Sequence, residues 1–146
     1  MPPDETVSLR PVTRANVRTI CDLELADSQR RLVAPSAYTV AEGNYEPGAG
    51  LRAIYRGDRP VGVLLVKLET GTPYLVQFMV DAQHPRAGVG RRAVELLVDE
   101  LRAAGWSVLE TSHARGADGP GALWRHCGFE PTGRELHDEP VLMRAL

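Results

Sequence analysis

The residues most suited to chemistry lie at one strand-to-helix junction in the second half of the chain. Arg86, Gly88 and Gly90 stand between an apolar run that ends at Val80 and a helical pattern that begins at Val89. Glycine lacks a Cβ, so the backbone of this loop can turn tightly and come close to a ligand. The free N–H groups and the dipole of a helix N-terminus favour an anion, and arginine matches phosphate oxygens. The junction therefore predicts a pyrophosphate site.

Three other interpretations of the junction compete with this one. A Gly-x-Gly can simply link a strand to a helix, with Arg91 and Arg92 solvated beside it. However, arginines at a helix N-terminus oppose the helix dipole unless an anion is present. A dinucleotide-binding unit would need a third glycine and parallel strands upstream, and a P-loop would need Gly-Lys-Ser/Thr. The sequence has neither feature, so the pyrophosphate interpretation is favoured.

The elements that must position this loop follow from the spacing of apolar residues. Alternation predicts strands, and spacing of three and four residues predicts helices. The expected strands are residues 7–12, 51–55, 61–68, 74–80, 106–111, a segment at Phe129, and 141–146. The expected helices are a first one from Arg14 to Leu25 capped by Thr13, then residues 28–33, a turn from Ser36 or Thr39, residues 89–104 ended by Gly105, and a last one from Pro120 to Cys127 capped by Asp118, with a loop at 43–50. This order predicts an α+β domain with a mixed sheet and helices on its faces.

Composition narrows the class of protein. A chain of 146 residues fits one domain, and its net charge of −2 lacks the basic field that nucleic-acid binding needs. Residues 61–66 form an apolar run far too short to cross a bilayer, and residues 1–4 do not resemble a signal peptide. Cys21 and Cys127 are the only cysteines. We therefore expect a single domain, 1–146, that is soluble, cytoplasmic and without membrane or nucleic-acid partners.

Several segments resemble the GNAT superfamily of acetyltransferases. Its acetyl-CoA-binding signature is similar to Phe78-Met79-Val80-Asp81, followed by Arg86-Ala87-Gly88-Val89-Gly90-Arg91 and the helix of residues 93–101. Gly116 and Leu123-Trp124-Arg125-His126-Cys127-Gly128-Phe129 resemble the family's Gly-Asn…Leu-Tyr-x-x-x-Gly-Phe segment. Residues 29–36, 41–42 and 138–143 resemble the spermine/spermidine acetyltransferase subgroup. The resemblance runs from about residue 6 to the C-terminus.

The resemblance implies a GNAT fold, with a mostly antiparallel twisted sheet of about six to seven strands and about four helices. It also implies acetyl-CoA as co-substrate, with the pantetheine arm pairing along a strand as an added strand would. The residues implied to bind it are Phe78, Met79, Val80, Arg86, Ala87, Gly88, Val89, Gly90, Arg91 and Trp124. The amide of Val80 is implied to stabilise the oxyanion. A homodimer is a further expectation from the family.

The catalytic part of the motif departs from the family pattern. Trp124 stands where a tyrosine often protonates the leaving thiolate, and an indole N–H does not give up its proton at neutral pH. Ala117 replaces an asparagine, and Pro85 replaces the usual first residue of the loop. Positioning can supply roughly 7–11 kcal/mol, so direct attack by an amine is feasible without that acid. An acetyl-cysteine route through Cys127 is disfavoured, because a helix C-terminus does not favour a thiolate.

Two residues are candidates for the base that takes the proton of the amine. Glu110 and His113 close the strand expected beside the cofactor strand, although each could equally be a solvated surface group. Asp81 is better explained as a residue of the turn that follows its strand. The histidines have no metal-ligand spacing, so no metal is expected.

The acceptor is expected to be a small primary amine, of the polyamine, antibiotic or peptide kind. Glu24, Asp27 and Glu139 fall in segments that usually line the acceptor groove of the superfamily, or else are solvated charges. The sequence thus predicts an acetyl-CoA-dependent N-acetyltransferase. The alternative is a GNAT-fold protein that binds acyl-CoA with little or no catalysis, acting as a sensor or a partner-binding module. Trp124 and Ala117 favour that alternative.

Overall fold

The computed structural model describes residues 6–23, 36–45, 49–68, 71–81, 88–113 and 121–146. These residues form seven strands and four helices. In chain order the elements are β1 (Val7–Pro11), α1 (Val17–Cys21), α2 (Ser36–Tyr45), β2 (Ala49–Arg56), β3 (Arg59–Lys67), β4 (Tyr74–Val80), α3 (Val89–Ala103), β5 (Val108–Ser112), α4 (Gly121–His126), β6 (Glu130–Leu136) and β7 (Glu139–Ala145). The predicted α+β class with a mixed, mostly antiparallel sheet is confirmed.

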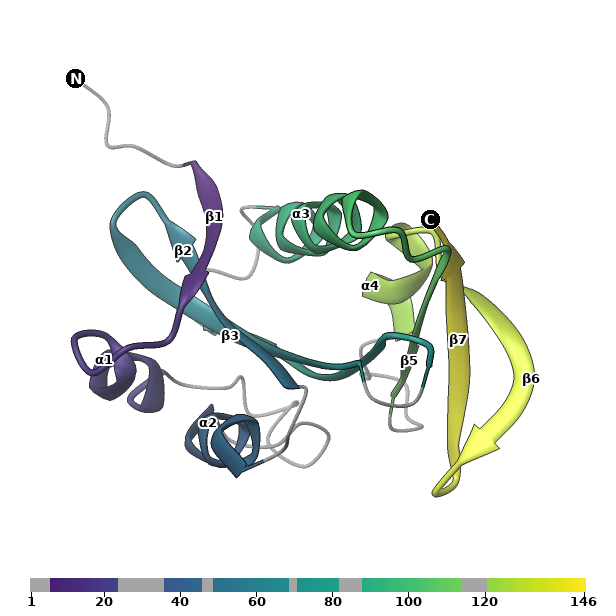
Figure 1. Ribbon diagram of the computed structural model, residues 1–146, viewed down its shortest axis with the longest axis horizontal. Helices are drawn as coiled ribbons and strands as arrows, with labels where there is room; N and C mark the ends of the chain where they lie inside the picture. The colour runs from purple at the N-terminus through teal and green to yellow at the C-terminus, as the bar shows by residue number, and fades with distance from the viewer. Residues whose placement is uncertain (1–5, 24–35, 46–48, 69–70, 82–87, 114–120) are drawn as a thin grey trace.

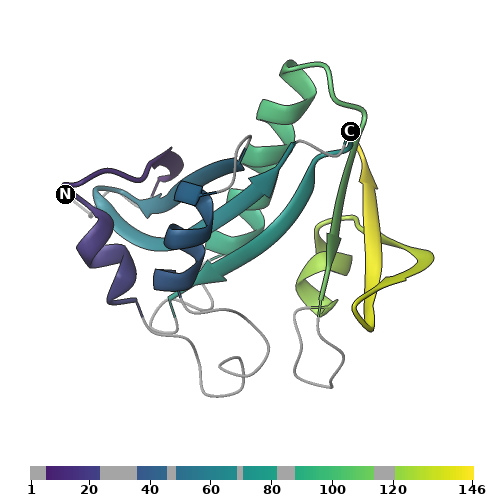
Figure 2. The same cartoon turned by 60° about the horizontal axis from the view of Figure 1, so that its bottom comes forward.

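All seven strands belong to one sheet, in the order β1-β2-β3-β4-β5-β7-β6. Neighbours are antiparallel except β4 and β5, which are parallel and pair through Tyr74↔Glu110 and Leu75↔Thr111. Beyond these pairs the two strands diverge. We call this divergence, between residues 76–80 of β4 and the end of β5 at Ser112, the fork. The two ribbon views show the sheet opening there (Figure 1 and Figure 2).

The two faces of the sheet carry different helices. On one face α3 and α4 cover a large apolar core, which includes Leu64, Leu109 and Trp124 (Figure 1). On the other face α1 and α2 cover a smaller cluster, which includes Val63 and Met79. Because neighbouring residues of a strand face opposite sides, β4 contributes to both layers.

Helix α3 forms because its apolar residues recur on one face. That face is buried and consists of Val89, Ala93, Val94, Leu97, Val98 and Leu101. The helix ends where the sequence predicts, at Gly105, whose φ of 94° suits glycine. The N–H of Gly105 bonds to the carbonyl of Arg102, and that of Trp106 to Leu101, both at 3.0 Å. This pair of bonds is a Schellman motif, which satisfies carbonyls that the helix leaves open.

The first two helices differ from the predicted ones. Helix α1 begins at Val17 rather than Arg14, because residues 14–16 form a turn. In that turn the N–H of Thr13 bonds to Oδ1 of Asn16 at 2.7 Å. Helix α2 extends to Tyr45, so the loop predicted for 43–50 is wrong in its first residues.

Helix α2 contains Gly43 because it lies very close to β2. A Cβ at Gly43 would stand 2.9 Å from Cβ of Leu51, which is too close for any other residue. The strand bounds shift by one or two residues, except those of β4, which are as predicted. Strand β5 starts at Val108 because Gly105 and Trp106 end the helix. Residues 25, 28–33, Asp118 and Pro120, which were expected to form or cap helices, lie outside the described residues.

The last two strands form a hairpin that the sequence only partly revealed. Expected segments at Phe129 and 141–146 are instead β6 and β7, each of seven residues. His137 and Asp138 connect them with φ values of 50° and 64°. Positive φ at both central residues is the geometry of a type I′ turn, and aspartate tolerates it better than most residues. The hairpin brings Glu139 back toward β5.

Candidate functional site

The backbone of β4 offers hydrogen-bond donors at the fork. The N–H of Asp81 bonds to the carbonyl of Val61 in β3 at 2.7 Å. Backbone direction alternates along a strand, so the N–H groups of Phe78 and Val80 point away from β3, toward the fork. The N–H of Met79 points toward β3, and its side chain packs against α1 and α2. Of the three residues predicted to pair with a ligand, two therefore present their amides.

A buried threonine marks the point where the fork begins. Thr111 is 1% exposed, and its Oγ1 donates to the carbonyl of Leu75 at 2.8 Å. These two residues are also the last parallel pair between the strands. A side-chain bond thus closes the pairing, and the β4 amides further along have no β5 partner among the described pairs.

The N-terminus of α3 packs against the open part of β4. Gly88 is the N-cap residue, with a φ of 68°, and Gly90 lies in the first turn. A Cβ at Gly90 would lie 3.6 Å from the Phe78 ring and 3.8 Å from Leu123 of α4. Arg91 is exposed, and the first turn holds no acidic residue. Free N–H groups and positive charge therefore meet beside the fork, as an anion site requires.

Helix α4 places an aromatic side chain with an unused donor beside β4. Trp124 is 3% exposed and contacts the ring of Phe78 edge to face, with centroids 5.3 Å apart. Its Nε1 has no hydrogen-bond partner among the described residues. A buried donor without a partner costs roughly 1–3 kcal/mol, so this Nε1 is available to an acceptor outside the described residues. Cys127 directly follows the last residue of this helix, and burial raises the pKa of its thiol.

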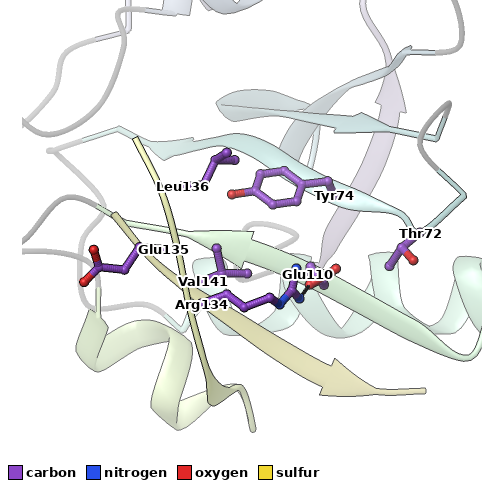
Figure 3. A pocket seen from close by; sticks show the side chains of 7 residues that line it. All are labelled: Thr72, Tyr74, Glu110, Arg134, Glu135, Leu136 and Val141. Carbon is purple, nitrogen blue, oxygen red and sulfur yellow. Dashed lines mark hydrogen bonds and ion pairs between the residues drawn. The ribbon is translucent and has the colours of Figure 1, made fainter. Parts of the chain in front are cut away.

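A hollow of about 510 Å³ opens over β4, β5 and the β6–β7 hairpin (Figure 3). Its lining residues are Thr72, Tyr74, Glu110, Arg134, Glu135, Leu136 and Val141. Arg134 reaches across from β6 to form an ion pair with Glu110, whose side chain is 16% exposed (Figure 3). The hollow thus combines carboxylates, one guanidinium and one phenol.

A chain of hydrogen bonds joins three strands at this hollow. The hydroxyl of Tyr74 donates to Oγ of Ser112 at 2.5 Å, and Ser112 donates to Oε1 of Glu139 at 2.9 Å. Burial raises the pKa of the Tyr74 phenol above its ordinary value of 10.0, and the nearby carboxylates act in the same direction. The bond to Ser112 and the charge of Arg134 oppose that shift. The phenol is therefore protonated at neutral pH.

The structure brings together some of the predicted site residues and separates others. Phe78, Val80, Gly88, Gly90 and Trp124 gather around the open part of β4. On the other side, Glu110 lines the hollow and Glu139 contacts it through Ser112. His113 directly follows β5 and is half-buried, but it is not among the residues that line the hollow. The remaining predicted residues, Arg86, Ala87, Glu24 and Asp27, lie outside the described residues.

Sequence reasoning missed two residues that line the hollow and one that bonds to its lining. The sequence pattern assigned no role to Tyr74, Ser112 or Arg134. Tyrosine and serine in strands, and arginine near a turn, are common surface residues. The available signal was alternation along β5, which puts Ser112 on the same face as Glu110. Only the pairing of β4 with β5 adds Tyr74 to that face.

Across the described ranges, no group of three or more His, Cys, Asp or Glu side chains could hold a metal ion. His126 is exposed on α4 and His137 lies in the hairpin turn, which separates them from each other. Among the helices that the structure describes, none has the length and apolarity to cross a membrane.

One known protein family is similar to most of this chain. The sequence model of the Acetyltransferase (GNAT) family matches residues 16–129. No curated protein sequence matches the chain. The resemblance to the spermine/spermidine subgroup is not confirmed by these comparisons and stays a prediction.

Solved structures share the fold at low sequence identity. A domain from Methanocaldococcus jannaschii has a TM-score of 0.78 and 14% identity, covering 98% of this chain and 100% of that one. The PaiA N-acetyltransferase of Thermoplasma acidophilum, in complex with coenzyme A, has a TM-score of 0.74 and 7% identity, covering 97% and 99%. The Salmonella typhimurium acetyltransferase that modifies the N-terminal serine of ribosomal protein L7/L12 has a TM-score of 0.75 and 14% identity, covering 97% and 95%.

Proposed function

Since the chain belongs to the GNAT family of acetyltransferases, we propose that it moves the acetyl group of acetyl-CoA onto a small primary amine by direct attack. The observation that carries the proposal is the fork. On one side of it lie an anion-binding helix end and a buried indole donor, and on the other lies a hollow with carboxylates.

The residues around the open part of β4 suit acetyl-CoA. The amides at the start of α3, with Arg91, are suited to its pyrophosphate, and we propose that Arg86 and Ala87 complete this loop. The backbone of Phe78 and Val80 is suited to pair with the pantetheine arm, as a strand would. The orphaned Nε1 of Trp124 is a donor for a polar atom of that arm. Coenzyme A is the ligand of the T. acidophilum protein, which shares the fold.

The chemistry needs a polarised carbonyl, a neutral amine and a route for one proton. Acetyl-CoA supplies an activated acetyl group with a thiolate leaving group. The sequence assigned this task to Val80, but the fork-facing amide of Phe78 lies two residues nearer the hollow, which Tyr74 lines. We propose that the amide of Phe78 donates to the carbonyl oxygen as negative charge develops there. One such donor contributes roughly 3–4 kcal/mol. Glu110 is a weaker candidate for the base than the sequence indicated, because its carboxylate is already engaged by Arg134.

The hollow is suited to a cationic acceptor. Glu110, Glu135 and Glu139 lie in or beside it, against the one guanidinium of Arg134. This balance favours an ammonium group, which must then lose a proton before it attacks. We propose that Glu24 and Asp27, which lie outside the described residues, also bind the acceptor. Two relatives in fold act on amines, as their names state, which agrees with this acceptor class.

One observation favours a second function, the binding of acyl-CoA without catalysis. Trp124 cannot serve as the acid that a tyrosine provides in the family motif. If the protein were a sensor, the fork would bind the co-substrate and the hollow would have no catalytic task.

The deciding experiment is a calorimetric titration with acetyl-CoA, followed by a thiol-release assay with spermidine, kanamycin and an alanine-terminated tetrapeptide. Micromolar binding together with release of free thiol on one amine supports the proposal and identifies the acceptor class. Binding without release on any amine supports the sensor function. Absence of binding would contradict both.

A further inference from the structure

The hydrogen-bond chain at the hollow has a defined direction. Tyr74 donates to Ser112, and Ser112 donates to Glu139, which as a carboxylate can only accept. The lone pairs of the Tyr74 oxygen are thus left to accept a proton from a molecule in the hollow, which Tyr74 lines. Each link is within hydrogen-bond distance, so a proton that enters at the phenol can leave at the carboxylate.

The chain also begins at the right place. Tyr74 pairs with Glu110 across the strands, but its hydroxyl bonds to Ser112, two residues further along β5. The ring therefore leans toward the open end of the fork. Strands rise about 3.3 Å per residue, so the fork-facing amide of Phe78 lies roughly 7 Å beyond the level of Ser112. An amine and the acetyl group that it attacks fit in this interval.

We propose that Tyr74 takes the proton of the attacking amine and that Ser112 and Glu139 carry it away, with Glu139 as the final acceptor. The inference rests on the proposed acetyl transfer and assigns the base of that reaction. Tyr74 is the group that touches the amine, whereas Ser112 and Glu139 act through it. This assigns Glu139 a role other than the acceptor binding expected from the sequence.

The step balances in atoms and charge. The ammonium first releases one proton to the solvent. The lone pair of the resulting neutral amine then forms the N–C bond, and the C–S bond breaks with its electron pair going to sulfur. The proton released by nitrogen passes to the phenol oxygen as the phenol proton passes to Ser112 and the Ser112 proton passes to Glu139. The products are the acetamide, the coenzyme A thiolate and a protonated Glu139. The hydroxyls of Tyr74 and Ser112 each still carry one proton.

The charged groups around the phenol agree with this route. Glu110 from β5, Glu139 from β7 and Arg134 from β6 all act on Tyr74. Glu110 is neutralised by its ion pair with Arg134, whereas the contact described for Glu139 is the hydroxyl of Ser112. Because burial raises the pKa of the Tyr74 phenol, the phenol retains the proton that the relay requires. Glu139 is therefore the better final acceptor.

The test compares Glu139→Gln, Tyr74→Phe and Ser112→Ala with the wild type, using acetyl-CoA with spermidine, kanamycin and the alanine-terminated tetrapeptide. A positioned base contributes roughly 10²–10⁴-fold, so we expect kcat of Glu139→Gln to fall about 10²-fold with KM changed less than about twofold. Ser112→Thr, which keeps the hydroxyl, should retain more kcat than Ser112→Ala. Double variants should lose no more than single ones, because the three residues act as one unit.

A pH profile separates the relay from a structural role. The shape of the kcat profile should change in Glu139→Gln, because that variant has no carboxylate to accept the proton from Ser112. The matched control is Glu130→Gln, the same exchange at an exposed residue of the same hairpin, which should behave as the wild type. Thermal unfolding and acetyl-CoA titration of every variant establish that fold and co-substrate binding are intact.

The outcomes distinguish this inference from the proposed function. Wild-type turnover with full kcat in Glu139→Gln would overturn the relay alone. A raised KM with unchanged kcat would also overturn it and return Glu139 to acceptor binding. Acetyl-CoA binding without wild-type turnover on any amine of the panel would overturn the proposed function and the relay with it.

Discussion

Two glycines at the start of α3 are predicted to fail in different ways when each is replaced by alanine. Gly88 has a φ of 68°, a conformation that costs an alanine roughly 1–2 kcal/mol. Gly90 has no such backbone, and its new Cβ would meet Phe78 at 3.6 Å, an ordinary contact. Alanine gains up to about 1 kcal/mol over glycine inside a helix. We therefore expect Gly88→Ala to lower the unfolding free energy and Gly90→Ala to leave it unchanged or raise it.

The same two variants should both weaken binding of coenzyme A. We expect a phosphate of coenzyme A to accept a hydrogen bond from an amide of this turn. The added methyl group would keep the phosphate from reaching that amide. The lost hydrogen bond to a charged group contributes roughly 1.5–3 kcal/mol. A weakening of roughly 10–100-fold follows, since about 1.4 kcal/mol equals a factor of ten. Calorimetry with coenzyme A measures this loss. Thermal unfolding should show Gly88→Ala lower by roughly 2–8 °C and Gly90→Ala within a few degrees of the wild type or above it.

Gly105 provides the control at the opposite end of the same helix. Its φ is 94° and a Cβ there would meet nothing within 4 Å, so Gly105→Ala should lose stability as Gly88→Ala does. It should bind coenzyme A normally. If Gly90→Ala also bound coenzyme A with wild-type affinity, the anion site would not lie at the start of α3 and the reasoning would be refuted.

Three further predictions concern stability and reactivity. Asn16→Ala should lower the free energy of unfolding by roughly 3 kcal/mol and the Tm by roughly 6–12 °C. The reason is that the buried Asn16 amide bonds to three partners, which the substitution would leave unpaired. Calorimetric unfolding measures both quantities. The Arg144 guanidinium bonds to Glu95 at 2.6 Å and lowers the pKa of that carboxyl below its ordinary 4.5, so the stabilisation is present above about pH 4.5 and lost as the pH falls further. Glu95→Gln should thus cost about 1 kcal/mol in urea unfolding at pH 7 and far less at pH 3, and an equal cost at both would contradict the ion pair. Burial raises the pKa of the Cys127 thiol, so a thiol reagent at pH 7 should modify the half-buried Cys21 first. The Cys127→Ala variant should keep the turnover of the wild type within about twofold. A loss of turnover above 10²-fold would indicate a covalent route.

The fold was predictable where one local rule decided the outcome. The full apolar stripe of helix α3 is visible in the sequence. The helix ends at Gly105 with a positive φ, a conformation that favours glycine. Strand β4 has the predicted bounds, since Pro73 precedes it and Asp81 follows it. Where tertiary packing decided, the prediction was wrong. Gly43 marks close packing of α2 on β2, although a glycine followed by an asparagine resembles a loop.

The candidate site divides in the same way. The anion loop and the strand before it depend on residues close in sequence, so Gly88, Gly90 and Phe78 could be found from their spacing. The proton chain depends on pairing between distant strands, which spacing does not encode. Tyr74 and Ser112 are 38 residues apart, and they meet only because β5 returns parallel to β4 in one register. A shift of one residue in that register would point Ser112 to the opposite face.

The fork has a consequence for solubility. A sheet that opens between β4 and β5 has an edge inside the molecule as well as the two outer edges, and unpaired amides at an edge invite pairing with another chain. The outer strand β6 is protected by Pro131, Gly133 and an interruption of its register with β7, which discourage a further strand. The inner edge at Phe78 and Val80 belongs to an apolar strand without such a device. A pantetheine arm bound along it would occupy those amides, so acetyl-CoA would guard the protein against self-association while it serves as the acetyl donor.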